Sequence, residues 1–127
     1  MSNPTINDLA TIKRTKVIQI LTPHVGTFLD LYSQTKQAHW NVRGSNFIGV
    51  HQLFDSEADK ILGYIDTIAE RILQLGGEAQ GTVKQAAKAT FLKEFPEIKQ
   101  SDDVLDHLSN QVSVSAAMIR SDIDKTA

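Results

Sequence analysis

Two histidines and three carboxylates occur at spacings that could place them around a metal ion. His51 and Asp55 are four residues apart, as are Asp66 and Glu70, and His39 precedes them in the segment KQAHWNVRGSNFIGVHQLFD. Residues four apart lie on one face of a helix. The chain has no cysteine, so only imidazole nitrogen and carboxylate oxygen are left as ligands. That donor set suits iron, manganese or zinc.

The four candidates on the second predicted helix share one sector of its surface. At about 100° per residue, their positions fall within roughly 100° of one another, beside the hydrophobic seam. Leucines lie in the same sector, which a solvated face would not favour, and polar residues fill a separate side. The helix therefore has two faces to bury. The apolar residues in the acidic sector are Leu62, Ala69 and Leu73, and the water-facing side holds Ser56, Lys60, Thr67, Arg71 and Gln74.

The two ligand pairs cannot reach one ion from a single helix. Asp55 and Asp66 are eleven residues apart, which is about 16 Å along a helix axis, whereas metal–ligand bonds are only about 2 Å long. An antiparallel two-fold contact would bring His51 and Asp55 of one subunit (the His51 pair) opposite Asp66 and Glu70 of its mate (the Asp66 pair). It would create two equivalent sites. His39 is expected to point inward and join them. Taken singly, each residue is more often a hydrogen-bonded core histidine or part of a solvated ion pair, so both interpretations stay open.

The elements that carry these residues are predicted to be helices throughout, which makes the fold class all-α. Apolar residues at three- and four-residue steps predict helices over about 7–40 and 47–75, a short helix over 82–93, and a last helix from Ser101 onward. Pro23 predicts a kink or a break in the first of them.

The turns and the buried positions follow from the same pattern. Gly44 is expected to take positive φ, Ser45 or Asn46 to cap the second helix, Ser101 to cap the last, and GGEAQG to end the second. The predicted core comprises Val17, Ile20, Leu21, Val25, Phe28, Leu31, Tyr32 and Thr35 on the first helix, Phe54, Ala58, Ile61, Ile65, Ile68 and Ile72 on the second, and Val104, Leu105, Leu108, Val112, Ala116, Ile119 and Ile123 on the last.

Length and composition predict one globular domain. The chain has 127 residues, 41% of them hydrophobic, and a formal net charge of -2, which fits a domain over 7–127 after a short disordered tail over 1–6. The sequence has neither a secretory signal nor an apolar run long enough for a bilayer, so a cytoplasmic protein without membrane contact is expected. Three long helices reach Ala127. The fourth, which would close an antiparallel bundle, is missing, so either a partner supplies it or the chain is a truncated piece.

Over residues 7–127 the chain resembles the Dps family, the miniferritins or DNA-binding proteins from starved cells. The resemblance rests on KQAHWNVRG, on the His51 pair and on the Asp66 pair around IDTIAERI. It implies a ferritin-like four-helix bundle subunit, here without its fourth helix, and a homo-oligomer in the form of a hollow dodecamer. It also implies a ferroxidase centre at a two-fold interface, with His39, His51 and Asp55 from one subunit and Asp66 and Glu70 from the other.

The same resemblance implies that Fe²⁺ binds there and is oxidised to Fe³⁺ by hydrogen peroxide or O₂, with hydrogen peroxide as the preferred oxidant. The product is then stored as mineral, which protects against oxidative damage. Trp40 would lie near the centre, as a quencher of stray oxidant or as an aromatic anchor. A non-catalytic bundle that holds zinc in the same site is one alternative. His24 and His107 match no site residue and are expected to be structural or exposed. Asp122 and Asp124, near the start of the family's iron-entry pore, are expected to be solvated.

A nucleoid protein that binds and compacts DNA, with secondary iron chemistry, is the rival function. Many DNA-binding members of the family carry a lysine-rich tail, but MSNPTINDLA has no lysine or arginine. Lys13, Arg14 and Lys16 follow on the first predicted helix and form at most a modest patch, whereas phosphate contacts need several clustered cations. DNA binding is therefore not expected, and nucleoid association would depend on it.

Overall fold

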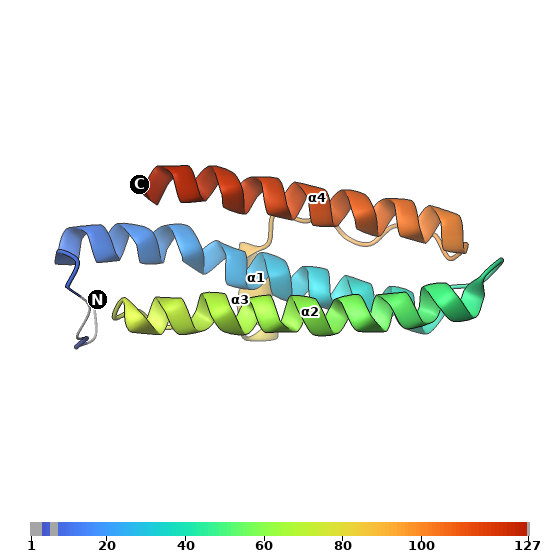
Figure 1. Ribbon diagram of the computed structural model, residues 1–127, viewed down its shortest axis with the longest axis horizontal. Coiled ribbons are helices and arrows are strands. Elements are labelled where there is room, and N and C mark those ends of the chain that lie inside the picture. Colours follow the sequence, from blue (N-terminus) through green and yellow to red (C-terminus); the bar gives the residue numbers. More distant parts are fainter. Residues whose placement is uncertain (1–3, 6–7, 127) are drawn as a thin grey trace.

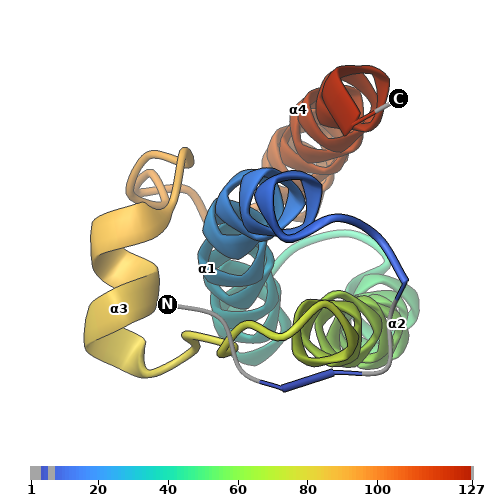
Figure 2. The same cartoon turned by 90° about the vertical axis from the view of Figure 1, so that its left-hand side faces the viewer.

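A computed structural model describes residues 4–5 and 8–126, and these form helices and their connections without a strand. In chain order the helices are α1 (Thr11–Asn41), α2 (Phe47–Gln74), α3 (Val83–Ala89) and α4 (Ser101–Thr126). The long helices α1, α2 and α4 run lengthwise beside one another (Figure 1), and the end-on view places α1 between α2, α3 and α4 (Figure 2). The all-α prediction is confirmed. No helix in this part of the chain is long and apolar enough to span a membrane.

Helix α1 runs unbroken through Pro23, where the sequence predicted a kink or a break. A proline inside a helix removes one backbone hydrogen bond. The turn that follows is enclosed, because His24, Val25 and Phe28 are all buried, and this packing keeps the backbone helical. The predicted start near residue 7 is wrong, since residues 8–10 precede the helix. Most of the predicted tail, and residue 7 itself, lies outside the described residues.

Helix α2 buries the seam that its sequence predicted. The seam packs against Val25, Phe28 and Leu31 of α1, and the two helices together enclose the larger of two core clusters. The predicted water-facing side of α2 is exposed. The buried seam consists of Phe54, Ala58, Ile61, Ile65, Ile68 and Ile72.

Two glycines end α2 in a Schellman motif. The N–H of Gly77 donates to the carbonyl of Ile72 at 2.9 Å, and that of Gly76 donates to the carbonyl of Leu73 at 3.0 Å. Gly76 has φ +91°, a left-handed conformation that glycine adopts without a Cβ clash. The prediction that GGEAQG terminates this helix is confirmed.

The turn between α1 and α2 is fastened to the residues that lead into α4. Gly44 has φ +104°, as predicted, whereas Asn46 stands before α2 at φ 60° and makes no side-chain capping bond, so the predicted cap is wrong. The N–H of Arg43 donates to the carbonyl of Lys99, and the N–H of Ser101 donates to the carbonyl of Arg43, both at 2.8 Å. These two bonds hold the turn, and with it the start of α2.

Helix α3 covers one side of α1. Thr82 begins it with a capping box, and Gly26 of α1 permits the close approach, since a Cβ there would lie 2.9 Å from the Cβ of Ala89. The helix ends at Ala89, earlier than predicted. The chain then turns back to α1, where the hydroxyl of Thr90 donates to Oδ2 of Asp30 at 2.8 Å.

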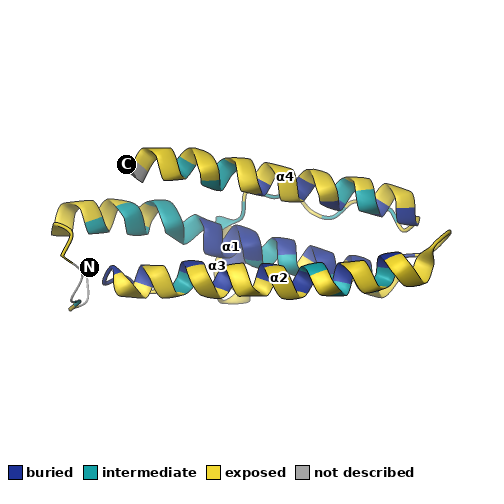
Figure 3. Cartoon of the chain, in the orientation of Figure 1, coloured by how far each residue is buried: buried dark blue, intermediate teal, exposed yellow. Residues whose placement is uncertain are grey.

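Helix α4 buries only part of the stripe that its sequence predicted, namely Val104 and Leu108. Val112, Ala116 and Ile123 were expected inside, but they are exposed, Val112 by 43% and Ile123 by 59%. Helix α4 packs mainly against α1 and barely contacts α2, so only one side of its apolar surface is covered (Figure 3). The residues that it buries are Ser101, Val104, Leu108, Gln111 and Ser115.

Ser101 does not serve as the predicted cap of α4. It is the first residue of the helix, and its hydroxyl donates to the carbonyl of Ser45 at 2.7 Å. The N–H of Val104 finds its acceptor in the carbonyl of Gln100 at 3.0 Å. The Ser101 side chain therefore ties α4 to the α1–α2 turn.

Candidate metal centre

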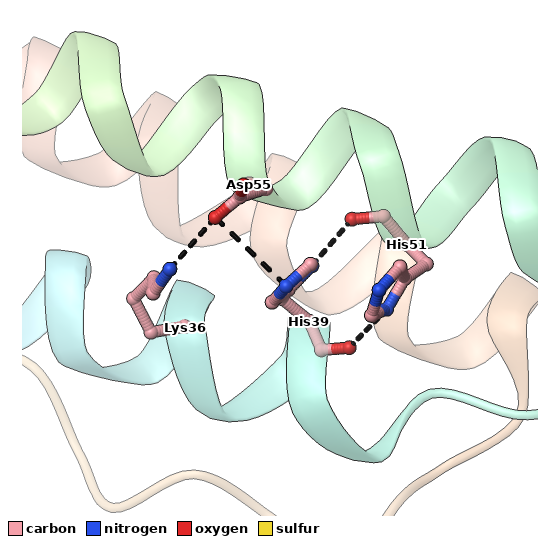
Figure 4. Close-up of polar contacts among 4 residues, drawn as sticks. All are labelled: Lys36, His39, His51 and Asp55. Atoms are coloured by element: carbon pink, nitrogen blue, oxygen red, sulfur yellow. Dashed lines mark hydrogen bonds and ion pairs between the residues drawn. The ribbon is translucent and has the colours of Figure 1, made fainter.

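Four side chains gather where α1 ends and α2 begins. Lys36 and His39 come from the C-terminal part of α1, and His51 and Asp55 come from the first turns of α2 (Figure 4). The two helices are joined by a short turn, so the rings of His39 and His51 face one another with their centroids 3.8 Å apart. Three of the five predicted ligands are thus brought together within one chain.

The backbone carbonyl of each histidine determines which nitrogen of the other ring carries the hydrogen. Nδ1 of His39 lies 2.6 Å from the carbonyl oxygen of His51, and Nδ1 of His51 lies 2.6 Å from the carbonyl oxygen of His39. A carbonyl oxygen only accepts hydrogen bonds, so each Nδ1 carries the hydrogen. The neutral rings then keep a lone pair on Nε2. Histidines that bind metals have this arrangement, with the second ring nitrogen donating to a carbonyl or a carboxylate.

Asp55 places a carboxylate beside these rings. Its Oδ1 lies 3.9 Å from Nε2 of His39, the atom that carries the lone pair. The His39 side chain is 15% exposed and that of Asp55 is 47% exposed, so the cluster opens from a nearly buried ring toward the surface. Imidazole nitrogen and carboxylate oxygen are suitable donors for Fe²⁺, Mn²⁺ or Zn²⁺.

Lys36 belongs to the cluster, although the sequence reasoning missed it. Its Nζ donates to Oδ1 of Asp55 at 2.7 Å. This hydrogen bond is the main cause that lowers the pKa of Asp55 below its usual 3.8 and raises the pKa of Lys36 above its usual 10.5. His39 and His51 add smaller electrostatic contributions that also lower the pKa of Asp55. The available signal was the spacing, because Lys36 lies one turn before His39 on the same face of α1.

Asp66 and Glu70 do not join this cluster. Both are exposed on α2, and the eleven residues that separate Asp55 from Asp66 correspond to about 16 Å along the axis. Among the residues that the structure describes, no group of three or more histidine, aspartate or glutamate side chains has the geometry of a complete metal site. One chain therefore carries two separate sets of candidate ligands, and their pairing across subunits stays a prediction.

The acidic sector of α2 is uncovered within one chain. Leu62 is 40% exposed and Leu73 is 57% exposed, in the sector that also carries Asp66 and Glu70. Ala69 between them is half-buried. An exposed surface that mixes leucines with carboxylates is typical of a contact with a partner rather than of a solvated face.

His24 and His107 are not part of the cluster, and Trp40 follows His39 directly in the chain. Trp40 is 67% exposed. His24 is buried, and its Nε2 donates to Oδ2 of Asp122 at 2.6 Å, so the prediction that Asp122 is a solvated residue is wrong. His107 is half-buried against Phe95, with ring centroids 5.0 Å apart. The structural interpretation of both histidines agrees with these contacts.

Comparison with known proteins gives consistent matches along the chain. The model of the ferritin-like domain matches residues 18–121. The DNA protection during starvation protein of Agrobacterium fabrum is 41% identical over 124 residues, which is 97% of this chain and 76% of that protein.

Solved structures match over a similar span. A tetragonal form of Dps from Mycobacterium smegmatis has a TM-score of 0.90 at 31% identity, over 98% of this chain and 76% of that chain. Dps from Microbacterium arborescens in its high iron form has a TM-score of 0.81 at 33% identity, over 94% of this chain and 77% of that chain.

Proposed function

The chain belongs to the Dps family, and from this premise we propose that it oxidises and stores iron at a site shared between two copies of itself. Fe²⁺ is the substrate, hydrogen peroxide is the preferred oxidant, and Fe³⁺ is kept as mineral inside a homo-oligomeric cage, a dodecamer. The protein thereby protects the cytoplasm against oxidative damage. Two names support this assignment: the Agrobacterium relative is named for protection during starvation, and the Microbacterium structure is of a high iron form.

The observation that carries the proposal is the pair of locked histidines beside a carboxylate. Their reciprocal 2.6 Å bonds leave both Nε2 atoms as electron-pair donors, and Nε2 of His39 lies 3.9 Å from Oδ1 of Asp55. The uncovered sector with Asp66 and Glu70 supplies the further carboxylates, which reach the histidines only from a second chain.

The residues of the site have separable roles in this proposal. His39 and His51 hold ferrous iron through imidazole nitrogen, and the carboxylates favour the harder ferric product. The ammonium group of Lys36 already binds Oδ1 of Asp55, so a metal ion on this carboxylate would meet a second cation beside it. Zn²⁺ takes the same donors and has no redox chemistry, so it would occupy the site without turnover.

The redox step balances with two metal ions. Each of two Fe²⁺ ions gives one electron, and one hydrogen peroxide molecule takes both electrons and becomes two hydroxide ions. A paired donation avoids the release of a hydroxyl radical, which a single electron would produce. The second chain is thus required for its carboxylates as well as for packing.

Stopped-flow oxidation of Fe²⁺ by hydrogen peroxide tests the assignment. His39→Ala and Asp66→Ala are each expected to slow iron oxidation by at least about tenfold, the loss typical of a removed metal contact. Glu57→Ala is the matched control, because Glu57 is nine residues from Asp66, on the opposite side of α2, where it pairs with Lys60 at 3.2 Å. If the two site variants consume iron as fast as the parent, the ferroxidase proposal fails.

Mixing the His39→Ala and Asp66→Ala variants tests whether two chains share the site. In a hybrid of a His39→Ala chain with an Asp66→Ala chain, one site receives both defects and the other receives none. Random pairing therefore restores about a quarter of the parental sites. Faster iron oxidation in the mixture than in either variant alone is the expected result. No recovery, in dimers shown by mass to be hybrids, would place the whole site within one chain.

The alternative of DNA binding finds little support in the described residues. The cationic patch expected near the start of α1 is reduced, because the Arg14 guanidinium already donates to the carbonyls of Leu9 and Leu75. Lys13 and Lys16 remain exposed there. Phosphate binding draws on several clustered cations, so we keep iron chemistry as the proposed function.

A further inference from the structure

The carbonyl of His39 lies at the end of α1, where helix carbonyls lack intrahelical partners. Helix α1 ends at Asn41, so the last four carbonyls need other donors. The amide four residues after His39 is that of Arg43, and it donates to Lys99 instead. The Nδ1–H of His51 fills the vacant place at 2.6 Å. A candidate ligand on α2 therefore also caps α1.

The return bond locks the second ring. The Nδ1–H of His39 donates to the carbonyl of His51 at 2.6 Å, and a carbonyl inside a helix has a second lone pair available for it. The two rings are nearly parallel, with an interplanar angle of 20°. Rotation of either ring breaks its own bond and removes the stacking surface of the other.

A third ring continues the stack. Phe47, the first residue of α2, stacks on His51 with centroids 5.3 Å apart and an interplanar angle of 26°. One face of His51 is occupied by His39, so Phe47 covers the other face. The Phe47 side chain is 42% exposed, which leaves it only a modest part in the core.

We propose that Phe47 is a positioning residue for the metal centre. Its ring holds His51, and through the reciprocal bonds His39, in the form with hydrogen on Nδ1 and both Nε2 atoms available for a divalent cation. The choice of iron as that cation rests on the proposed function, but the three-ring stack and the Nδ1–H forms exist without metal. Phe47 touches no reacting atom, and it acts through His51.

The physical need for such a residue comes from the chemistry of imidazole. In water the neutral ring prefers its hydrogen on Nε2, which would block that atom as a ligand. The helix-end carbonyl reverses this preference only while the ring keeps its orientation. The Phe47 ring, stacked on His51 with an interplanar angle of 26°, would restrain rotation about the Cβ–Cγ bond of His51. A leucine has similar bulk and no flat face.

Solid-state ¹⁵N NMR of histidine-labelled, metal-free protein tests the stack directly. The chain has only four histidines, and the signals of His24 and His107 are assigned by their omission in His24→Asn and His107→Gln variants. At pH about 8.5, where histidine is normally neutral, the parent is expected to show the Nδ1–H form at both His39 and His51. Phe47→Leu is expected to convert both to mixtures of the two forms.

Co²⁺ titration followed by visible absorption supplies the second measurement. Phe47→Leu is expected to raise the Kd for Co²⁺ by about tenfold, the loss typical of a residue that orients a metal ligand. Phe47→Tyr keeps the ring and is expected to behave as the parent in both experiments. Ile48→Ala is the matched control, because Ile48 is the next residue, is 67% exposed and offers no ring.

The outcomes separate this inference from the proposed function. Parental NMR signals in Phe47→Leu, or an equal loss in Phe47→Tyr, would overturn the role of Phe47 and leave the iron assignment intact. If the parent itself binds no Co²⁺, the assigned function is wrong, and the NMR comparison still decides whether Phe47 holds the histidines.

Discussion

At the scale of single residues, the ammonium group of Lys36 and a metal ion would share the carboxylate of Asp55. Lys36 Nζ lies 2.7 Å from Oδ1 of Asp55, and the same oxygen is the one nearest Nε2 of His39. The pair keeps Asp55 ionised in the absence of metal, since its hydrogen bond lowers the pKa of that carboxyl. A metal ion on this carboxylate would either displace the ammonium group or lie close to it, and both cost free energy. Lys36 is therefore expected to weaken the site for divalent ions.

Lys36→Met is expected to tighten Co²⁺ binding by about tenfold. The change removes the competing cation while it keeps the length of the side chain. Isothermal titration at neutral pH measures the effect. Lys60→Met is the control, because Lys60 also pairs with a carboxylate but on the far side of α2. Weaker binding in Lys36→Met would mean that the lysine supports the site instead of competing for it.

At the scale of elements, α4 is joined near its first residue to the α1–α2 turn and near its other end to α1. One joint is the Ser101–Ser45 contact, and the other is the bond from His24 to Asp122 at 2.6 Å. His24 is only 1% exposed, so loss of its partner leaves a buried polar group unsatisfied. The pKa of Asp122 is lowered, first by the hydrogen bond from Lys125 and then by that from His24.

Asp122→Ala is expected to lower the free energy of unfolding by about 1–3 kcal/mol at neutral pH, the usual penalty for a buried polar group left without a partner. Because the folded-state pKa of Asp122 is depressed, its ionised form contributes stability above the usual carboxyl pKa of 3.8. That contribution is lost as the pH falls through the lowered value. Urea titrations should therefore show parent and variant converging in acid. Asp124→Ala, two residues away and exposed, should match the parent throughout.

The contrast between α2 and α4 shows what periodicity can predict. All six apolar seam positions of α2 are buried, because that helix has one large neighbour and its seam faces it. On α4 the pattern marked Val112 and Ile123 as inside, yet the structure buries Gln111 and Ser115. Apolar periodicity marks every face of a helix that is to be buried, whether by its own chain or by another chain. It does not say which neighbour buries which face. Lys36 escaped prediction for a related reason, because its partner lies on another helix.

At the scale of the whole molecule, α2 presents equally exposed leucines on two opposite sides. Leu62 is 40% exposed and Leu53 is 43% exposed. Their separation of nine positions places them about 180° apart around the helix axis. Of these two leucines, Leu62 is the one that shares the sector of Asp66 and Glu70, the carboxylates that a second chain must deliver. If the site is built across a two-fold axis, that sector is the contact, and a charge placed there disrupts assembly and chemistry together.

Leu62→Glu is accordingly expected to release the two-fold contact, which light scattering after size exclusion reports as a lower mass, and to abolish peroxide-driven iron oxidation. The buried, unpaired carboxylate would cost several kcal/mol at such a contact. Leu53→Glu introduces the same charge at a matched exposure on the other side, and it is expected to keep the dimer and its iron oxidation. Because both variants remain helical if the subunit folds alone, circular dichroism separates lost assembly from lost folding. An active, full-mass Leu62→Glu protein would show that the subunits meet elsewhere and that Asp66 and Glu70 do not serve the histidines of a neighbour.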